Sequence, residues 1–368
     1  AVAAYLLKKQ GHDVTCAFMR NWDSLTNDDI QGNPTLNEEV CPQEQDYNDA
    51  KKTADRLGLK LLRVDFIEEY WQNVFHTFLD EYRKGRTPNP DILCNKYIKF
   101  SSFMKFAEKN GFDTVATGHY AKIFYKDGMY LIGKANDRNK DQSYFLCQID
   151  RSCLSHILFP LSDISKPEVR KIAEELNLDI AHKKDSTGIC FIGERHFREF
   201  LSNYLPMKPG KILNLSNKNV AGTHQGVLYY TIGQRKGLDI GGTGPYFVVG
   251  KNIKTNELYV VDSRHEQLLY SDSCIISNMN ILADFQQPID CNAKFRYRQS
   301  DNPVHLSKLD DNRWLAEYPQ KVRSVTPGQE AVFYDGDIML GGGVIDRVFL
   351  NSADMQTIIE GEAAEIER

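Results

Sequence analysis

The first half of the chain alternates helical and extended segments, and this order restricts the fold more than any other feature. The expected strands are 14–19, 59–66 and 113–117, and the expected helices are 1–10, 47–57, 71–82 and 96–110. Such alternation is typical of a parallel sheet with helices on both faces. Ligands bind such sheets beyond the carboxyl ends of the strands, where Met19, Gly118 and His119 lie. The sequence therefore predicts an α/β domain with a site at that edge.

The second half has a different character, with short apolar strands separated by turns. A capping box at 165–168 opens the last long helix of the first half, and a short helix at 197–205 precedes Pro206, Pro209 and Gly210. From about residue 274 to 350 the strands are brief, and Asp335-Gly336 is a hairpin signal. This pattern predicts a small β-barrel. The expected boundaries are 1–195 for the α/β domain, 196–272 for a small central domain, 273–352 for the barrel and 353–368 for an acidic, disordered tail.

Several classes of protein are disfavoured. No apolar run reaches 18 residues, so we expect no membrane span, and the first ten residues do not resemble a signal peptide. The eight cysteines contain no Cys-x-x-Cys pair, which argues against a disulfide framework and against a zinc site. We therefore expect a cytoplasmic protein without a structural metal.

The charge distribution permits a nucleic-acid partner in spite of a net charge of −5. Segment 353–368 alone carries a net charge of −4, so the rest of the chain is close to neutral. Basic clusters occur at 183–184, 235–236, 294–298 and 321–323. A near-neutral body with local basic clusters is able to bind RNA through a limited surface.

Cys94 is the first candidate for chemistry. It lies in a polar peptide stiffened by Pro88 and Pro90, and the helix expected from Lys96 follows directly. A thiol beside a helix N-terminus, with Lys96 and Lys99 nearby, is expected to ionise readily. An incidental cysteine in front of a helix explains the same pattern equally well.

Cys190 is the second candidate, and it follows a Ser-Thr-Gly run. The glycine at 188 would let the backbone approach a ligand closely. Taken alone, a cysteine at the edge of a core strand is the better interpretation of this residue. Two thiols in unusual peptides suggest sulfur chemistry shared between two loops, whereas Cys16, Cys147 and Cys291 have structural surroundings.

Other polar residues have two interpretations each. His119 ends a strand and is able to contact a substrate, although a structural histidine is the commoner case. Segment 140–143 (Lys140, Asp141, Gln142 and Ser143) is suited to phosphate or base contacts, and a simple N-cap explains Asp141 equally well. The expected strand at 294–298 alternates cation and aromatic at Arg296 and Tyr297, which suits RNA or a solvated barrel face.

Together these segments resemble the tRNA-specific 2-thiouridylases. The similar stretches are 18–22, 81–96, 116–120, 140–146, 185–193, 230–235 and 326–329. They extend over nearly the whole chain, and the two cysteine peptides are the longest. The resemblance implies an ATP-pyrophosphatase domain of the adenine-nucleotide α-hydrolase type, followed by a central domain and a β-barrel.

The same resemblance implies a reaction. ATP, accompanied by Mg²⁺, would adenylate the oxygen on carbon 2 of the wobble uridine, and a persulfide on Cys190 would deliver sulfur with Cys94 as the partner nucleophile. By this resemblance Met19 and Gly118 contact ATP, and Asn89, Pro90 and Asp91 hold the target base. The residues expected to contact tRNA are His119, Lys140, Asp141, Gln142, Arg296, Tyr297 and Gln329. A cysteine desulfurase or a sulfur-relay protein would supply the sulfur.

One departure from the family pattern bears on activity. The family begins with a strand and a Ser-Gly-Gly-x-Asp-Ser loop, whereas this sequence begins in the helix after that loop. Backbone N–H groups of glycine-rich turns bind phosphate, so we expect weak ATP binding and a destabilised sheet. A tRNA-binding fragment without catalysis is the alternative, and a small-molecule ligase is a third, less favoured interpretation.

Overall fold

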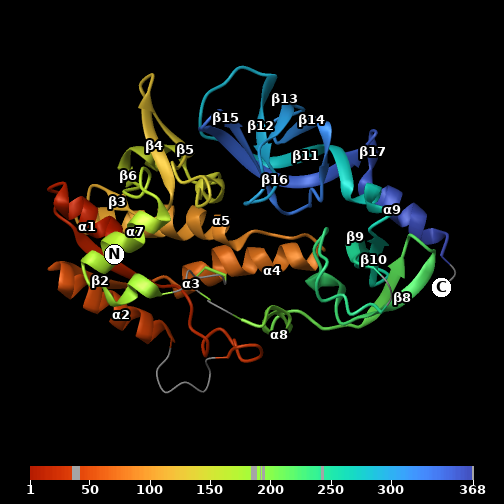
Figure 1. Ribbon diagram of the computed structural model, residues 1–368, viewed down its shortest axis with the longest axis horizontal. Helices are drawn as coiled ribbons and strands as arrows, with labels where there is room; N and C mark the ends of the chain where they lie inside the picture. The colour runs from red at the N-terminus through yellow and green to blue at the C-terminus, as the bar shows by residue number, and fades with distance from the viewer. Residues whose placement is uncertain (35–41, 184–188, 191, 193–194, 242–243, 367–368) are drawn as a thin grey trace. The chain divides into compact units, whose positions relative to one another are not determined.

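The computed structural model describes residues 1–34, 42–183, 189–190, 192, 195–241 and 244–366. The chain forms two compact units (Figure 1). The first comprises Ala1–His76, Pro90–Asn203 and Asp337–Met339, and the second comprises Thr77–Asn89, Tyr204–Gly336 and Leu340–Arg368.

The first unit contains the predicted parallel strands. Strand β1 (Thr15–Arg20) pairs in parallel with β2 (Lys60–Asp65), and β3 (Val115–Ala116) pairs in parallel with β6 (Ile157–Leu158). Strands β4 (Ala121–Lys126) and β5 (Met129–Lys134) form an antiparallel hairpin. The α/β fold class is confirmed. In the described part of the chain, however, the parallel strands form two separate pairs rather than one continuous sheet.

Helices pack against these strands. Helix α1 (Val2–Lys9) and helix α7 (Lys166–Glu175) meet in an apolar cluster that includes Val2, Ala173 and Leu57, the last residue of α2 (Pro42–Leu57). The predicted capping box is present, because the Ser165 side chain accepts from the Glu168 N–H and the Glu168 carboxylate accepts from the Ser165 N–H. The sequence pattern thus located the start of α7.

Two longer helical runs each contain a π-helical segment. The first consists of α3 (Ile67–Tyr70), η1 (Trp71–Phe75) and α4 (His76–Arg83), and the second of α5 (Pro90–Cys94), η2 (Asn95–Ser102) and α6 (Phe103–Lys109). The second run corrects a prediction, because the helix expected from Lys96 begins at Pro90. Proline is favoured in the first turn of a helix, where its missing N–H costs nothing. Cys94 therefore lies inside a helical run rather than in front of it.

The remaining helical segments of the described chain are short. They are η3 (Ser143–Leu146), η4 (Arg151–His156), η5 (Asp179–His182), α8 (Phe197–Ser202), η6 (Val227–Tyr229) and η7 (Glu266–Leu269). Within the described residues, no helix combines the length and apolar character needed to cross a membrane.

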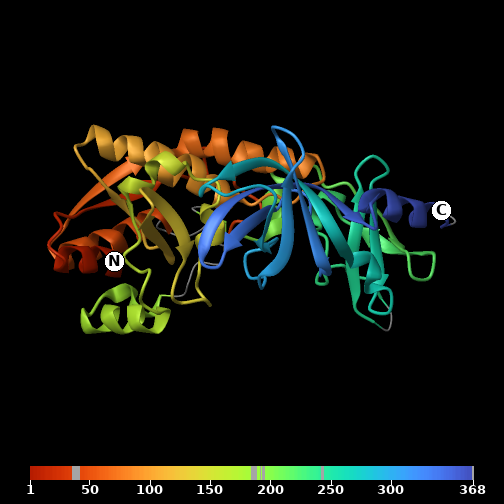
Figure 2. The same ribbon diagram turned by 90° about the horizontal axis from the view of Figure 1, so that it is seen from above.

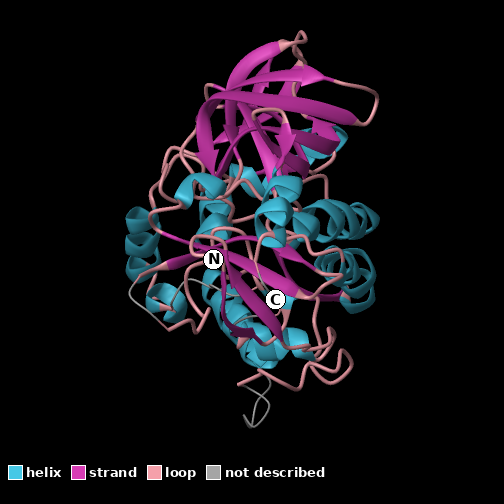
Figure 3. Ribbon diagram, turned by 90° about the vertical axis from the view of Figure 1, so that its right-hand side faces the viewer, coloured by secondary structure: helices cyan, strands magenta, loops and turns pink. Residues whose placement is uncertain are grey.

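The second unit contains a four-stranded sheet and a barrel. The sheet has the order β8-β7-β10-β9, from β7 (Gly210–Asn214), β8 (Asn219–His224), β9 (Tyr246–Asn252) and β10 (Glu257–Asp262). The barrel strands are β11 (Tyr270–Ile281), β12 (Ile289–Lys294), β13 (Asn302–Lys308), β14 (Arg313–Arg323), β15 (Glu330–Asp335) and β16 (Ile338–Leu350). Their order is β11-β14-β13-β12-β15-β16, and pairing of β16 with β11 closes the ring (Figure 3). The predicted barrel and its Asp335-Gly336 turn are confirmed.

Residues 353–364 of the acidic segment form a short strand and a helix, which corrects the expectation of disorder for this part. After the short strand β17 (Ala353–Asp354), helix α9 (Met355–Ala364) begins with the Asp354 carboxylate accepting from the N–H groups of Gln356 and Thr357. Met355, Ile359 and Ala363 recur every four residues and are buried. Helix α9 lies beside β9 in both views (Figures 1 and 2). Apolar residues at this spacing bury one helix face despite the excess of acid.

Candidate active site

The two singled-out cysteines meet in the first unit. Their Sγ atoms are 3.8 Å apart although 96 residues separate them, and the Cys94 thiol donates to the Cys190 sulfur. Cys94 ends α5 and is fully buried. The Cys190 backbone is held on both sides, because its N–H donates to Asp91 Oδ1 (3.2 Å) and its C=O accepts from the Tyr70 hydroxyl (2.8 Å). The predicted convergence of the two thiols is therefore present in the structure.

The two thiols differ in their tendency to ionise. A hydrogen bond from the Cys94 thiol and the nearby Lys99 ammonium lower the pKa of Cys190 to about 7, against the opposing effect of burial. Burial and the neighbouring Cys190 raise the pKa of Cys94 well above its usual value. The proton thus stays on Cys94 while Cys190 becomes the thiolate.

This assignment overturns the expectation that a helix N-terminus activates Cys94. The partial positive charge of a helix falls off within its first turn, and the run begins at Pro90, four residues before Cys94. Of the two lysines expected to supply a cationic field, only Lys99 faces the thiols. The Lys96 ammonium instead donates to Gln148 Oε1 at 3.2 Å.

Three further groups surround the sulfur pair. Burial raises the pKa of Asp91 above its usual value, although Lys99 opposes this effect. Burial also raises the pKa of Tyr70, which remains a neutral hydroxyl donor. Burial disfavours charge on Lys99, yet Cys190, Cys94 and Asp91 together raise its pKa, so this lysine stays cationic. The sulfur atoms thus share one buried positive charge.

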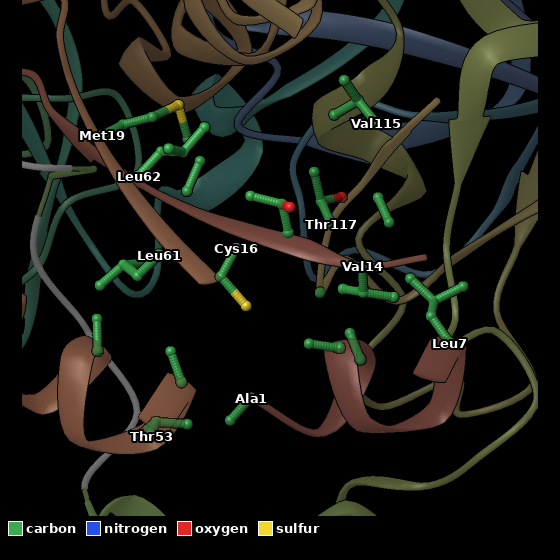
Figure 4. A pocket seen from close by; sticks show the side chains of 18 of the residues that line it. Ala1, Leu7, Val14, Cys16, Met19, Thr53, Leu61, Leu62, Val115 and Thr117 are labelled. Carbon is green, nitrogen blue, oxygen red and sulfur yellow. The ribbon is translucent and has the colours of Figure 1, made fainter. Parts of the chain in front are cut away.

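A pocket of about 910 Å³ lies beside β1 in the same unit. Val14, Cys16 and Met19 line it from the β1 segment, while Leu61 lines it from β2 and Thr117 follows β3 (Figure 4). Gly118, His119 and Lys99 also line this pocket. It therefore contains both residues expected to contact ATP, and Lys99 belongs to the pocket as well as to the sulfur pair.

The pocket partly fits an adenine nucleotide. Its volume is within the range of small-molecule sites, and its alanine, leucine and valine side chains are suited to a base and a ribose. Lys99 and Lys166 supply cations for phosphate groups, whereas Lys183 is paired with Asp46 and Asp49 of the same wall. Gly118 is the only glycine among the described residues of its wall, so the glycine-rich turn expected for this family is not part of that wall.

The residues of the first unit that were expected to contact tRNA have internal partners. His119 Nδ1 lies 2.7 Å from the Thr117 hydroxyl, and burial lowers the pKa of His119 well below its usual value, so the ring is neutral. Asp141 accepts from the N–H groups of Ala135 and Ser143, and Gln142 Oε1 accepts from the Tyr120 N–H. Lys140 lies in the turn just before them and is half-buried.

The other expected tRNA residues lie in the second unit. The Arg296 guanidinium donates to the Ile232 carbonyl (2.6 Å) and to the Thr326 hydroxyl (2.7 Å). Gln329 Nε2 donates to the Thr87 carbonyl at 2.7 Å. Arg296 and Tyr297 lie in the bend and turn after β12, so the expected strand at 294–298 is wrong except at Lys294, where β12 ends. Asn89 belongs to this unit as well, whereas Pro90 and Asp91 belong to the first.

Sequence reasoning missed the residues that support the Cys190 segment. Arg195, five positions after Cys190, pairs with the fully buried carboxylate of Asp29 at 2.8 Å, and the Trp22 indole N–H donates to the same carboxylate at 3.0 Å. On the other side, the Lys183 ammonium pairs with two carboxylates of α2. The sequence analysis also assigned no role to Tyr70, whose hydroxyl donates to the Cys190 carbonyl. These partners are remote in sequence, and no local pattern marks them.

The fold and site together define an α/β protein with a pocket beside β1, a paired thiol centre and a C-terminal barrel. Three family descriptions match in chain order. They are a tRNA methyl transferase HUP domain at 1–194, a tRNA methyl transferase PRC-barrel domain at 198–262 and an aminomethyltransferase beta-barrel domain at 271–345.

The relatives identify the family more narrowly. The chain is 52% identical to the tRNA-specific 2-thiouridylase MnmA of Mycoplasma capricolum and 53% identical to that of Mesoplasma florum, in each case over 95% of this chain and 96% of the relative. It is 49% identical to the protein of that name from Staphylococcus carnosus, over 98% of this chain and 95% of the relative. The chain belongs to the tRNA-specific 2-thiouridylase family.

Proposed function

We propose that this protein transfers sulfur to carbon 2 of the wobble uridine of tRNA in an ATP-dependent reaction. Cys190 carries the sulfur as a persulfide, and Cys94 is the partner nucleophile. The observation that supports this proposal is the 3.8 Å approach of two thiols whose pKa values shift in opposite directions. A pair with one thiolate and one protonated thiol suits stepwise thiol–disulfide exchange.

The first step loads sulfur onto Cys190. Its thiolate attacks the outer sulfur of a donor persulfide, R–S–SH, to give Cys190–S–SH and the donor thiolate R–S⁻. A cysteine desulfurase or a sulfur-relay protein is the donor that this chemistry requires. A thiol with a pKa of about 7 is half ionised at neutral pH and is close to the optimum for such an attack.

The second step uses the pocket beside β1. ATP supplies the adenylate that makes the uridine oxygen a leaving group. Met19 and Gly118 contact the nucleotide, and Lys99 contributes positive charge at the wall. Mg²⁺ would accompany ATP, because this ion is usually bound through substrate phosphates.

The third step moves sulfur to the base. The ionised outer sulfur of the Cys190 persulfide attacks carbon 2, and AMP leaves. The Cys94 thiolate then attacks the Cys190 sulfur, which releases 2-thiouridine and leaves a Cys94–Cys190 disulfide that an external thiol reduces. Cys94 ionises at this stage because Cys190 is no longer an anion, whereas Lys99 still is a cation.

The tRNA must present an extruded base to this site. We assign Asn89, Pro90 and Asp91 to the target base. The residues assigned to the rest of the tRNA are His119, Lys140, Asp141, Gln142, Arg296, Tyr297 and Gln329. A reducing compartment such as the cytoplasm keeps the thiol pair ready for another cycle.

The test is mass analysis of nucleosides from tRNA incubated with the protein, ATP and a persulfide donor. Cys190→Ser is expected to abolish 2-thiouridine formation, because a hydroxyl cannot carry sulfane sulfur. Cys153→Ser is the matched control, since Cys153 is partly exposed and its thiol donates to the Asp150 carbonyl. Full activity of the Cys190→Ser protein would refute the assigned role.

A further inference from the structure

Lys99 lies on the face of its helix that carries Cys94 because the helix is widened there. In a regular α-helix, residues five positions apart point about 140° away from each other. Cys94 is the N-cap of η2, whose π-helical hydrogen bonds join residues five apart and bring them onto one face. The widened turn therefore allows the lysine and the thiol to share a site.

The surroundings of Lys99 are few and well defined. Its ammonium is hydrogen-bonded to Cys190 and lies close to Cys94 and Asp91. Tyr70 approaches the thiols from α3, and His119 follows β3. Tyr70 and His119 are neutral, so Asp91 is the one carboxylate among these described neighbours that competes with the thiols for the ammonium.

We propose that Lys99 is the positioning cation of the reaction. From the wall of the pocket beside β1, it holds the sulfur carried by Cys190 as an anion, both as the thiolate before loading and as the persulfide after loading. This inference rests on the proposed function and adds a residue to it. The lysine keeps its proton throughout. In loading, the S–S bond of the donor breaks and the Cys190–sulfur bond forms, which gives Cys190–S–SH and the donor thiolate. The persulfide proton then passes to that thiolate, so the products are Cys190–S–S⁻ and the donor thiol R–SH, without any redox partner.

Its position also links the two halves of the reaction. Lys99 lines the pocket that holds Met19 and Gly118, so one cation faces both the sulfur and the space assigned to ATP. A persulfide anion next to a buried cation is stabilised where it forms, since few water molecules compete for it. We therefore expect loss of this charge to affect Cys190 before tRNA or ATP is present.

The experiment measures the ionisation of Cys190 in the full chain without tRNA, ATP or donor. The rate of iodoacetamide alkylation of the Cys190 peptide is followed by mass spectrometry from pH 5.5 to 10. The unaltered protein should show a midpoint near 7. Lys99→Met should move it towards the usual value of about 8.5, with about a tenfold slower reaction at pH 7. Lys99→Arg should restore a midpoint within about half a unit of the original.

Controls separate this effect from a general structural one. Lys96→Met removes a lysine of the same helix whose ammonium bonds Gln148, and it should leave the midpoint unchanged. If Lys99→Met does not fold, as judged by its melting curve, Lys99→Gln provides the uncharged variant. An unchanged midpoint in a folded, uncharged variant would overturn the proposal. The proposed function is tested separately by the Cys190→Ser protein. If the uncharged Lys99 variant shifts the midpoint but the Cys190→Ser protein is fully active, the proposed function is refuted and the role of Lys99 in ionising Cys190 stands.

Discussion

The ion pair between Arg195 and Asp29 provides a demanding test of the reasoning, because both groups are almost inaccessible. The Asp29 side chain is 0% exposed and the Arg195 side chain 8% exposed, with their charged atoms 2.8 Å apart. Replacing Arg195 by Met keeps much of its apolar stem and removes the charge. The Asp29 carboxylate then remains buried without its cation.

The magnitude follows from the partners that remain. Breaking a buried ion pair typically costs about 3–5 kcal/mol. Asp29 keeps hydrogen bonds from the Trp22 indole (3.0 Å) and the Ser24 hydroxyl (3.3 Å), so we expect the lower end, about 3 kcal/mol. For a unit of this size, that corresponds to a fall in Tm of roughly 6–12 °C.

Differential scanning calorimetry measures the shift. Arg63→Met is the matched control, because its pair with Glu44 is solvent-exposed and should contribute at most about 1 kcal/mol. Adding Asp29→Asn to Arg195→Met removes the stranded charge and should recover part of the lost stability. If Arg195→Met lowers Tm no more than Arg63→Met does, the buried pair is not a structural support of the Cys190 segment.

Two further predictions concern stability. Burial lowers the pKa of Lys251 to about 7, whereas an unfolded lysine has a pKa of about 10.4, so the unfolded chain binds more protons between these values. Stability of the second unit should therefore rise with pH from 7 to about 10, and Lys251→Met should abolish this rise in calorimetric scans. Gly32 has φ +69°, and an added Cβ would lie 2.6 Å from the Phe200 nitrogen, whereas Gly11 has φ +90° and open space around it. Gly11→Ala should lower the free energy of unfolding by about 1–2 kcal/mol, from backbone strain alone. Gly32→Ala should lower it distinctly more, because the added Cβ also clashes with the Phe200 backbone. Urea denaturation measures both variants, and equal losses of stability would contradict the predicted clash.

Local patterns in the sequence predicted most of the elements. The capping box at Ser165 located the start of α7, and the helix expected at 71–82 lies within the run from α3 to α4, where Val74, Phe78 and Tyr82 are buried. The Asp335-Gly336 turn predicted the last hairpin of the barrel. These features depend on interactions within a few residues, so a single sequence reports them. The helical run from Pro90 was placed too late because proline was interpreted only as a turn residue.

The sequence by itself determined that two thiols lie in unusual peptides and that helices and strands alternate before a barrel. The tertiary structure decided which thiol ionises. It buried Cys94, turned Lys99 towards Cys190 through a π-helical turn, and brought the two sulfur atoms to 3.8 Å. A pKa depends on burial and on charges a few ångströms away. Those neighbours come from chain segments far apart, and only the folded chain brings them together.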